Sequence, residues 1–208
     1  MEKRIFNLII VDESGSMSVI ERQALEGMNE TLETVQKMQE QHKEMEQRVT
    51  LITFDSTHTK FIYDNAAAAG APKLSPKDYN PGGATPLYDA IGIGISKVNA
   101  LTSADDRVLV TIITDGEENC SQEYNLKMIK NLVEKLKKQN WTFTFIGTDN
   151  LDVEGTAGAM GINNHFSFAE DAEGTREMFR CERECRSRYN DRVASNKEDA
   201  DGYFDSDK

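Results

Sequence analysis

The stretch LIIVDESGSM, residues 8–17, joins an apolar run directly to a row of oxygen-bearing side chains. Residues 5–11, IFNLIIV, are mostly apolar, which is typical of a strand covered on both faces. Asp12, Ser14 and Ser16 follow this strand at once. In an open α/β sheet, ligands bind outside the carboxyl ends of the strands. The stretch therefore predicts a ligand-binding edge that begins at Asp12.

The rest of the chain alternates between strand-like and helix-like segments. Apolar runs predict strands, and apolar residues at three- and four-residue steps predict helices. The expected strands cover residues 5–11, 49–54, 60–64, 107–114, 141–147 and 164–169. The expected helices are a long one after residue 18 and others at 86–98, 123–139, 151–161 and 172–188. This order predicts a doubly wound, mostly parallel α/β sheet of Rossmann-like type, with helices on both faces and the 60–64 strand at an edge.

Two further loops carry oxygen donors at equivalent places. Thr85 follows the glycines of NPGGATP, and Asp115 ends the strand VLVTIITD. With Asp12, Ser14 and Ser16 they supply two carboxylates and three hydroxyls to one edge of the sheet. The full set of candidate metal ligands is Asp12, Ser14, Ser16, Thr85 and Asp115.

Oxygen-only ligation favours a hard divalent cation. Mg²⁺ is typically held through one or two carboxylates at about 2.0–2.1 Å, and Mn²⁺ suits a similar donor set. Zinc is disfavoured because no Cys or His accompanies the donors. Glycines in these loops allow the backbone to approach an ion closely; they are Gly15, Gly82, Gly83 and Gly116. Each donor taken singly has an alternative interpretation as a helix N-cap, Thr85 before Pro86 above all.

The motifs VDESGSM (11–17), GGATPLYDAI (82–91) and VTIITDGEEN (110–119) resemble those of the von Willebrand factor type A domain and its metal-ion-dependent adhesion site. The resemblance covers roughly residues 3–188 and implies the strand order 3-2-1-4-5-6, with a short antiparallel edge strand. It implies that Ser14 and Ser16 bind the ion directly and that Thr85 binds it when a partner is engaged. Asp12 and Asp115 would act directly or through water, and Ala84 departs from the hydroxyl residue often found before the Thr.

The same resemblance implies a function. In that family the vacant coordination position takes a Glu or Asp carboxylate from a protein partner. Intracellular bacterial members, some of which work with ring-forming ATPases, are closer models than adhesive extracellular ones. We therefore expect a non-enzymatic adaptor or scaffold module whose ion binds an acidic partner residue. Rim residues expected on the loops around the ion are Glu13, Met17, Tyr79, Glu117, Glu118 and Asp149.

The alternative is a metal-dependent hydrolase acting on a phosphate or ester. Ser14 lies in DESGS, which lacks the first glycine of the G-x-S-x-G elbow. A catalytic triad needs a histidine in reach, and none of His42, His58 and His165 is expected beside Ser14. The metal loops carry acids and no basic residue that would neutralise a phosphate. Binding without catalysis is the favoured hypothesis.

Charge and composition limit the partners and the compartment. A formal net charge of -12 disfavours nucleic acid and anionic membrane surfaces as ligands. No segment approaches the roughly 20 apolar residues of a membrane span, and the N-terminal apolar run is too short for an export signal. The cysteines Cys120, Cys181 and Cys185 suggest no disulfide framework. We expect a cytoplasmic protein, and its oligomeric state is open.

The end of the chain is expected to lie apart from the domain at 1–188. Residues 189–208 are acidic and poor in apolar side chains, which predicts a mobile tail. A calcium loop is excluded because Lys197 and Lys208 occupy its first and last ligand positions. Acidic side chains of the tail could alternatively offer a carboxylate to the ion of the same or another copy.

Overall fold

The structure, a computed structural model, describes residues 3–197 and 202–205. Its six strands form one sheet in the order β3-β2-β1-β4-β5-β6. All neighbouring strands are parallel except the antiparallel pair of β2 and the edge strand β3. The strands are β1 (Lys3–Asp12), β2 (Met45–Asp55), β3 (His58–Ala67), β4 (Arg107–Thr114), β5 (Trp141–Thr148) and β6 (Asn164–Phe168). The predicted fold class and strand order are confirmed, although β3 is longer than expected.

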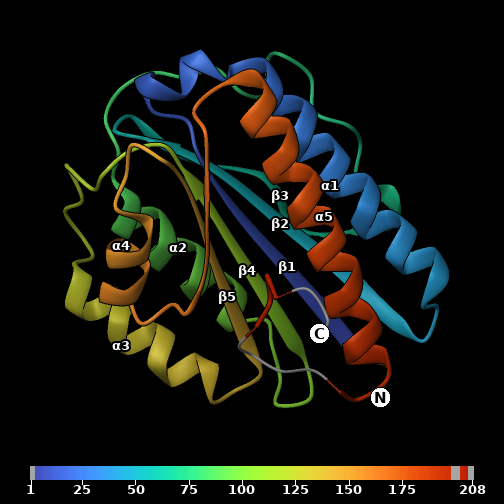
Figure 1. The fold of residues 1–208 in the computed structure, drawn as a ribbon. Coiled ribbons are helices and arrows are strands. Elements are labelled where there is room, and N and C mark those ends of the chain that lie inside the picture. The colour runs from blue at the N-terminus through green and yellow to red at the C-terminus, as the bar shows by residue number, and fades with distance from the viewer. Residues whose placement is uncertain (1–2, 198–201, 206–208) are drawn as a thin grey trace.

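Helices cover both faces of this sheet (Figure 1). They are η1 (Gly15–Val19), α1 (Glu21–Gln41), η2 (Ala68–Gly70), α2 (Leu87–Asn99), α3 (Leu126–Lys137), α4 (Val153–Ala159) and α5 (Ala172–Ala194). Helices α1 and α5 lie side by side on one face, while α2, α3 and α4 share the other core. Among the helices of the described residues, none has the length and apolar character needed to traverse a lipid bilayer.

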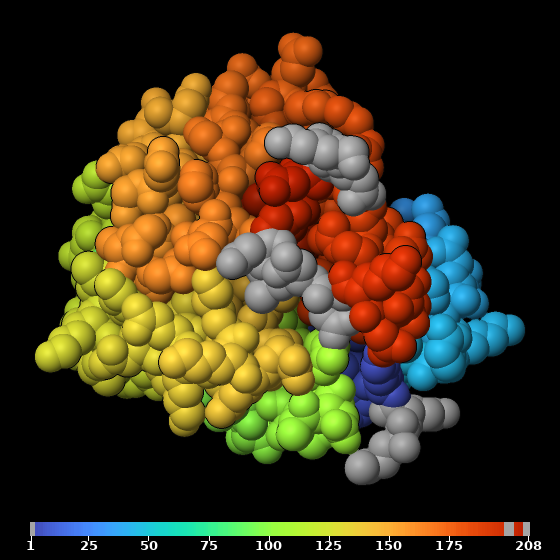
Figure 2. Space-filling view, turned by 60° about the horizontal axis from the view of Figure 1, so that its bottom comes forward, coloured from blue at the N-terminus to red at the C-terminus, as the bar shows by residue number. Residues whose placement is uncertain are grey.

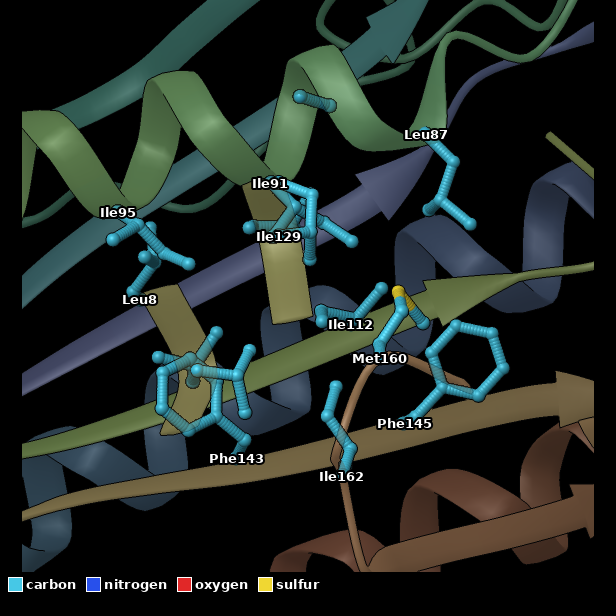
Figure 3. Packing of buried hydrophobic residues seen from close by; sticks show 14 of the residues in the cluster. Leu8, Leu87, Ile91, Ile95, Ile112, Ile129, Phe143, Phe145, Met160 and Ile162 are labelled. Atoms are coloured by element: carbon cyan, nitrogen blue, oxygen red, sulfur yellow. The ribbon is translucent and has the colours of Figure 1, made fainter. Parts of the chain in front are cut away.

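The central strands are apolar on both sides because each side faces a layer of helices. In β1, Leu8 and Ile10 belong to the core beneath α2, whereas Ile9 and Val11 belong to the core beneath α1. Figure 3 shows the first of these cores, where side chains of α2 and α3 meet those of the strands. This two-sided burial explains the unbroken apolar runs in the sequence.

The apolar stripe on α1 packs as its spacing predicts. Met28, Leu32 and Val35 are fully buried on the side that faces the sheet and α5. Gly27 allows the two helices to approach closely, since a Cβ at this position would come 2.0 Å from Cδ2 of Phe179 in α5. The contact holds α5 against α1 along its amino-terminal half.

The chain beyond residue 188 differs from the expected mobile tail. Helix α5 continues to Ala194, and its residues Tyr189 and Val193 are buried. Tyr203 is also fully buried, with its backbone N–H donating to Asn164 Oδ1 at 3.0 Å. Figure 2 shows the red residues 202–205 seated against α5. The remaining tail positions, 198–201 and 206–208, lie outside the described residues.

A buried polar network joins α5 to the middle of the sheet. Arg186 is completely buried, pairs with Glu182 at 2.6 Å and donates to Asn7 Oδ1 in β1 at 2.6 Å. It also donates to the Thr111 hydroxyl in β4 at 2.8 Å. The hydroxyl of Tyr203 donates to Glu182 at 3.1 Å. The aromatic side chain near the chain's end therefore stabilises the helix through the same ion pair.

Candidate functional site

Two adjacent strands deliver the two carboxylates to the same edge of the sheet. Asp12 is the last residue of β1, and Asp115 directly follows β4. These strands are parallel neighbours, with Val11 beside Ile113, so their carboxyl ends meet. This edge lies at the top of Figure 1, where the blue η1 turn begins.

Hydrogen bonds connect four of the five candidate ligands. The Ser16 hydroxyl donates to Asp115 Oδ1 at 2.8 Å, and the Ser14 and Ser16 hydroxyls lie 3.3 Å apart. Asp12 Oδ1 accepts from the Ser14 N–H at 2.7 Å, while Asp12 Oδ2 accepts from the Thr114 hydroxyl at 2.6 Å. The loop after β1 is thus tied to the loop after β4 through the proposed ligands themselves.

Thr85 reaches the same group from the loop before α2. Its backbone N–H donates to Asn119 Oδ1 at 2.9 Å, and its carbonyl accepts from the Asn119 N–H at 3.1 Å. A Cβ placed on Gly116 would lie 3.3 Å from Thr85 Oγ1 and 3.9 Å from Ser16 Oγ. Both hydroxyls therefore border the space beside Gly116. Helix α2 has Pro86 at its N-cap with no side-chain hydrogen bond, so Thr85 does not act as its cap.

The two carboxylates are buried with little compensating positive charge. Burial raises the pKa of Asp115 to about 6, and burial also raises the pKa of Asp12. The charged neighbours that raise their pKa values are themselves carboxylates: Asp55 acts on Asp12, and Asp12 and then Glu170 act on Asp115. Asp115 is 8% exposed, and its Oδ2 atom is buried without a hydrogen-bond partner. Buried ionised groups require a partner, so this oxygen favours a bound cation.

The donor set fits a hard cation and not a site built from carboxylates and histidines. Across residues 3–197 and 202–205, no group of three or more His, Cys, Asp and Glu side chains is placed to hold a metal ion. Hydroxyls supply three of the five candidate donors, and hydroxyl and carboxylate oxygens are ligands that Mg²⁺ and Mn²⁺ accept. The arrangement can therefore bring a divalent cation and an incoming anion together at the sheet edge.

The expected rim residues divide into buried and exposed groups. Glu13, Met17 and Tyr79 are buried, and they stabilise the loops instead of forming a contact surface. The Tyr79 hydroxyl donates to the Asp12 carbonyl at 2.7 Å. Glu118 is half-buried and accepts hydrogen bonds from backbone N–H groups at the start of α2 and in its own loop. Only Glu117 and Asp149 of this set are exposed.

None of the three histidine rings contacts Ser14 within the described part of the chain. His42 meets Asp191, His58 meets Glu13, and His165 meets the Asn163 carbonyl. The Ser14 hydroxyl lies 3.3 Å from the Ser16 hydroxyl, and the Ser14 side chain also hydrogen-bonds the Asp12 carboxylate.

Three further residues at the site are absent from the sequence-based prediction. Thr114 orients Asp12, Asn119 holds the Thr85 backbone, and Glu170 adds negative charge near Asp115. Thr114 ends a strand, where threonine is common for its β-propensity alone, so its hydroxyl gave no distinct signal. Glu170 comes from the segment before α5, which carries no metal motif. Asn119 lies within the quoted motif VTIITDGEEN and could have been singled out from it.

Comparison with known proteins agrees with this fold. The family model for the von Willebrand factor type A domain matches residues 8–180, so the chain belongs to that family. Domains of this family generally act as protein-interaction modules. No curated protein sequence matches the chain.

Solved structures share the fold at low sequence identity. The PilB minor pilin from Streptococcus sanguinis has a TM-score of 0.64 at 13% identity, and the match covers 95% of this chain and 63% of the pilin. The chain thus spans less than two thirds of that protein. The SpRpn10 VWA domain has a TM-score of 0.59 at 14% identity, covering 86% of this chain and 94% of that domain. The pilus adhesin SpaC from Lactobacillus rhamnosus GG has a TM-score of 0.63 at 13% identity, covering 88% and 30%.

Proposed function

We infer that this chain is a divalent-metal-dependent protein-binding module. Asp12, Ser14, Ser16, Thr85 and Asp115 would hold Mg²⁺ or Mn²⁺ at the carboxyl edge of the sheet. The observation that carries this proposal is the buried, unpartnered Oδ2 of Asp115, which lies in a group that already contains Asp12 and two serine hydroxyls. A dication would compensate both buried carboxylates at once.

Such an ion would still attract one more anion. Its ligands would carry two negative charges, and its neutral hydroxyls would leave a coordination position for a stronger oxygen donor. A Glu or Asp side chain of a protein partner has the required charge and hardness. The negative charge of this protein would not attract an acidic partner, and physiological salt screens the repulsion between them beyond about 8–10 Å. The direct bond between the partner carboxylate and the ion would therefore supply most of the affinity.

Two parts of the proposal rest on the family resemblance and on composition. We place the module in the cytoplasm because the described cysteines Cys120, Cys181 and Cys185 are all free, as thiols are in reducing compartments. Assembly with a ring-forming ATPase follows from intracellular bacterial members alone. Copurification of such an ATPase with the chain would support that assembly.

The test is capture of a partner from cell extract on the immobilised protein in the presence of millimolar magnesium. We expect specific proteins that EDTA releases and that Asp115→Ala fails to retain. Asp105→Ala is the matched control, because Asp105 is exposed in the loop before β4, at the opposite end of that strand from Asp115. Replacing single Glu and Asp residues of the captured partner should then locate the carboxylate. Retention in EDTA, or equal retention by both variants, would contradict the proposal.

A further inference from the structure

The surface around the candidate metal site is acidic on one side. Glu117 is exposed two residues beyond Asp115. Asp149 is exposed beside Thr148, whose hydroxyl donates to the Asp115 carbonyl at 3.2 Å. The negative charge of Glu170 raises the pKa of Asp115, and the Glu170 carboxylate accepts a hydrogen bond from Asn150 in the loop that follows β5. We call Glu117, Asp149 and Glu170 the acidic side.

The other side of the site carries lysines. An open depression there is lined by residues that include His58, Lys60, Lys77 and Gly83. It begins at the metal loop, because the Gly83 carbonyl accepts from the Gly15 N–H at 3.1 Å. Lys77 is exposed, and Lys60 is half-buried with its ammonium group donating to the Asp78 carbonyl at 3.0 Å. We call Lys60 and Lys77 the lysine side.

The acids within the depression do not cancel these lysines for an incoming ligand. Glu13 is 3% exposed, and its carboxylate already meets His58 and the Asn80 N–H. Asp55 is 6% exposed and accepts from the Thr57 N–H, the Thr57 hydroxyl and the His58 N–H. Both carboxylates are buried and hydrogen-bonded inside the protein. The half-buried Asp78 accepts from the Ser75 N–H and hydroxyl, and the charges of Lys60 and Lys77 also lower the pKa of its carboxyl group. A ligand on this surface therefore meets two ammonium groups and one half-buried carboxylate.

We propose that the partner segment is bipolar, with its metal-binding carboxylate between an acidic flank and a basic flank. The acidic flank lies over Lys60 and Lys77, and the basic flank meets Glu117, Asp149 and Glu170. This inference rests on the proposed function. An ion bound at the unpartnered Asp115 Oδ2 would hold the partner carboxylate between the lysine side and the acidic side. It also explains how a protein of net charge -12 accepts an acidic residue: the repulsion is confined to one side of the rim.

Each ion pair between the partner segment and this exposed rim should change the binding constant by a modest factor. Exposed ion pairs typically change an equilibrium constant by about two- to fivefold, and like-charge pairs act in the opposite direction by similar amounts. Two pairs on each side would together separate a bipolar ligand from a uniformly charged one by about tenfold or more.

Fluorescent peptides with one central Glu provide the probe. One carries Asp residues on one flank and Lys residues on the other; two matched peptides carry Asp on both flanks or Lys on both. In Mg²⁺ at physiological ionic strength, we expect the bipolar peptide to bind about tenfold more tightly than either uniform peptide. Fluorescence anisotropy measures all three affinities, and EDTA should abolish binding.

Paired charge reversals identify the two sides. Lys60→Glu with Lys77→Glu should shift the preference to the uniformly basic peptide, and Glu117→Lys with Asp149→Lys should shift it to the uniformly acidic one. Mg²⁺ affinity is measured on the same variants and should stay within about threefold, because none of the four residues is a proposed ligand. Equal Mg²⁺-dependent binding of all three peptides would overturn this inference alone. Absence of Mg²⁺-dependent binding by every peptide would overturn the proposed function as well.

Discussion

The carboxylate of Glu13 lies between His58 and the backbone of Asn80. Its Oε2 is 3.1 Å from His58 Nε2, and its Oε1 accepts from the Asn80 N–H at 2.5 Å. The Glu13 backbone also accepts from the Gly82 N–H at 2.8 Å. This one residue therefore joins the loop that holds Asp12, Ser14 and Ser16 to the loop that leads to Thr85.

Removing the Glu13 side chain should loosen the proposed metal site without removing any of its proposed ligands. We expect Glu13→Ala to weaken Mg²⁺ binding about five- to tenfold and to lower the free energy of unfolding by about 1–3 kcal/mol, since it leaves buried polar groups without partners. Calorimetric titration and urea unfolding measure the two effects. Glu117→Ala, on an exposed neighbour, is the control and should change neither quantity appreciably; equal effects of the two variants would contradict the role of Glu13.

Asp115→Asn should stabilise the metal-free protein and abolish its response to magnesium. The folded state raises the pKa of Asp115 from 3.8 to about 6, so the metal-free protein loses stability as pH rises from about 4 to about 6 and stays at the lower value above that range. The shift corresponds to at most about 3 kcal/mol, and we expect a gain of about 1–2 kcal/mol from the substitution at pH 7.5. Urea unfolding in EDTA and in Mg²⁺ gives both values. An Asn variant that is less stable in EDTA would show that Asp115 is already compensated within the protein.

Gly116→Ala should crowd the hydroxyls of Thr85 and Ser16, which border the proposed ion position. The added Cβ would lie 3.3 Å from Thr85 Oγ1, which is tighter than an ordinary van der Waals contact. We expect Mg²⁺ affinity to fall about tenfold while the free energy of unfolding in EDTA changes by less than about 1 kcal/mol. Gly82→Ala is a matched control in a nearby loop, because a Cβ there meets nothing within 4 Å. Equal Mg²⁺ affinities of the two variants would place the ion elsewhere.

Tyr203 should contribute to stability although it lies close to the end of the chain. We expect Tyr203→Phe to cost about 1 kcal/mol through the lost hydrogen bond to Glu182, and Tyr203→Ala to cost about 3–5 kcal/mol through the cavity it leaves. Tyr124→Phe removes an exposed hydroxyl bonded to Ser96 and should cost less than about 0.5 kcal/mol. Chemical denaturation checks all three variants. An unchanged free energy of unfolding for Tyr203→Ala would contradict the buried position.

The features predicted well from the sequence are those with a local signal. The apolar runs of β1 and β4 indicate strands that are covered on both faces. Asp12 and Asp115 come at the carboxyl ends of these strands, and in a parallel sheet such ends lie at the same edge. The stripe on α1 likewise predicts its buried side. Each of these signals is contained in a stretch of fewer than about 20 residues, the usual length of a strand or helix and its cap.

The features that sequence reasoning missed depend on partners far along the chain. In the sequence, Glu13 resembles an exposed acidic residue of a loop. In the fold it is buried, because His58 and the Asn80 backbone contact its carboxylate. Apart from the adjacent Phe204, the residues around Tyr203 are mostly acidic or polar, so composition predicted a mobile tail. Its burial arises from contact with Glu182 and Asn164, which no periodicity of the final segment reveals.

Binding of Mn²⁺, followed by electron paramagnetic resonance as the protein is titrated, tests the central claim most directly. One tight Mn²⁺ per chain is predicted, displaced by Mg²⁺, lost in Asp12→Ala and in Asp115→Ala, and retained in Asp105→Ala. If Mn²⁺ stays free in solution at millimolar concentration, or if the Asp12 and Asp115 variants bind it as well as the Asp105 control, these side chains do not hold a metal and the proposed mode of partner binding is wrong.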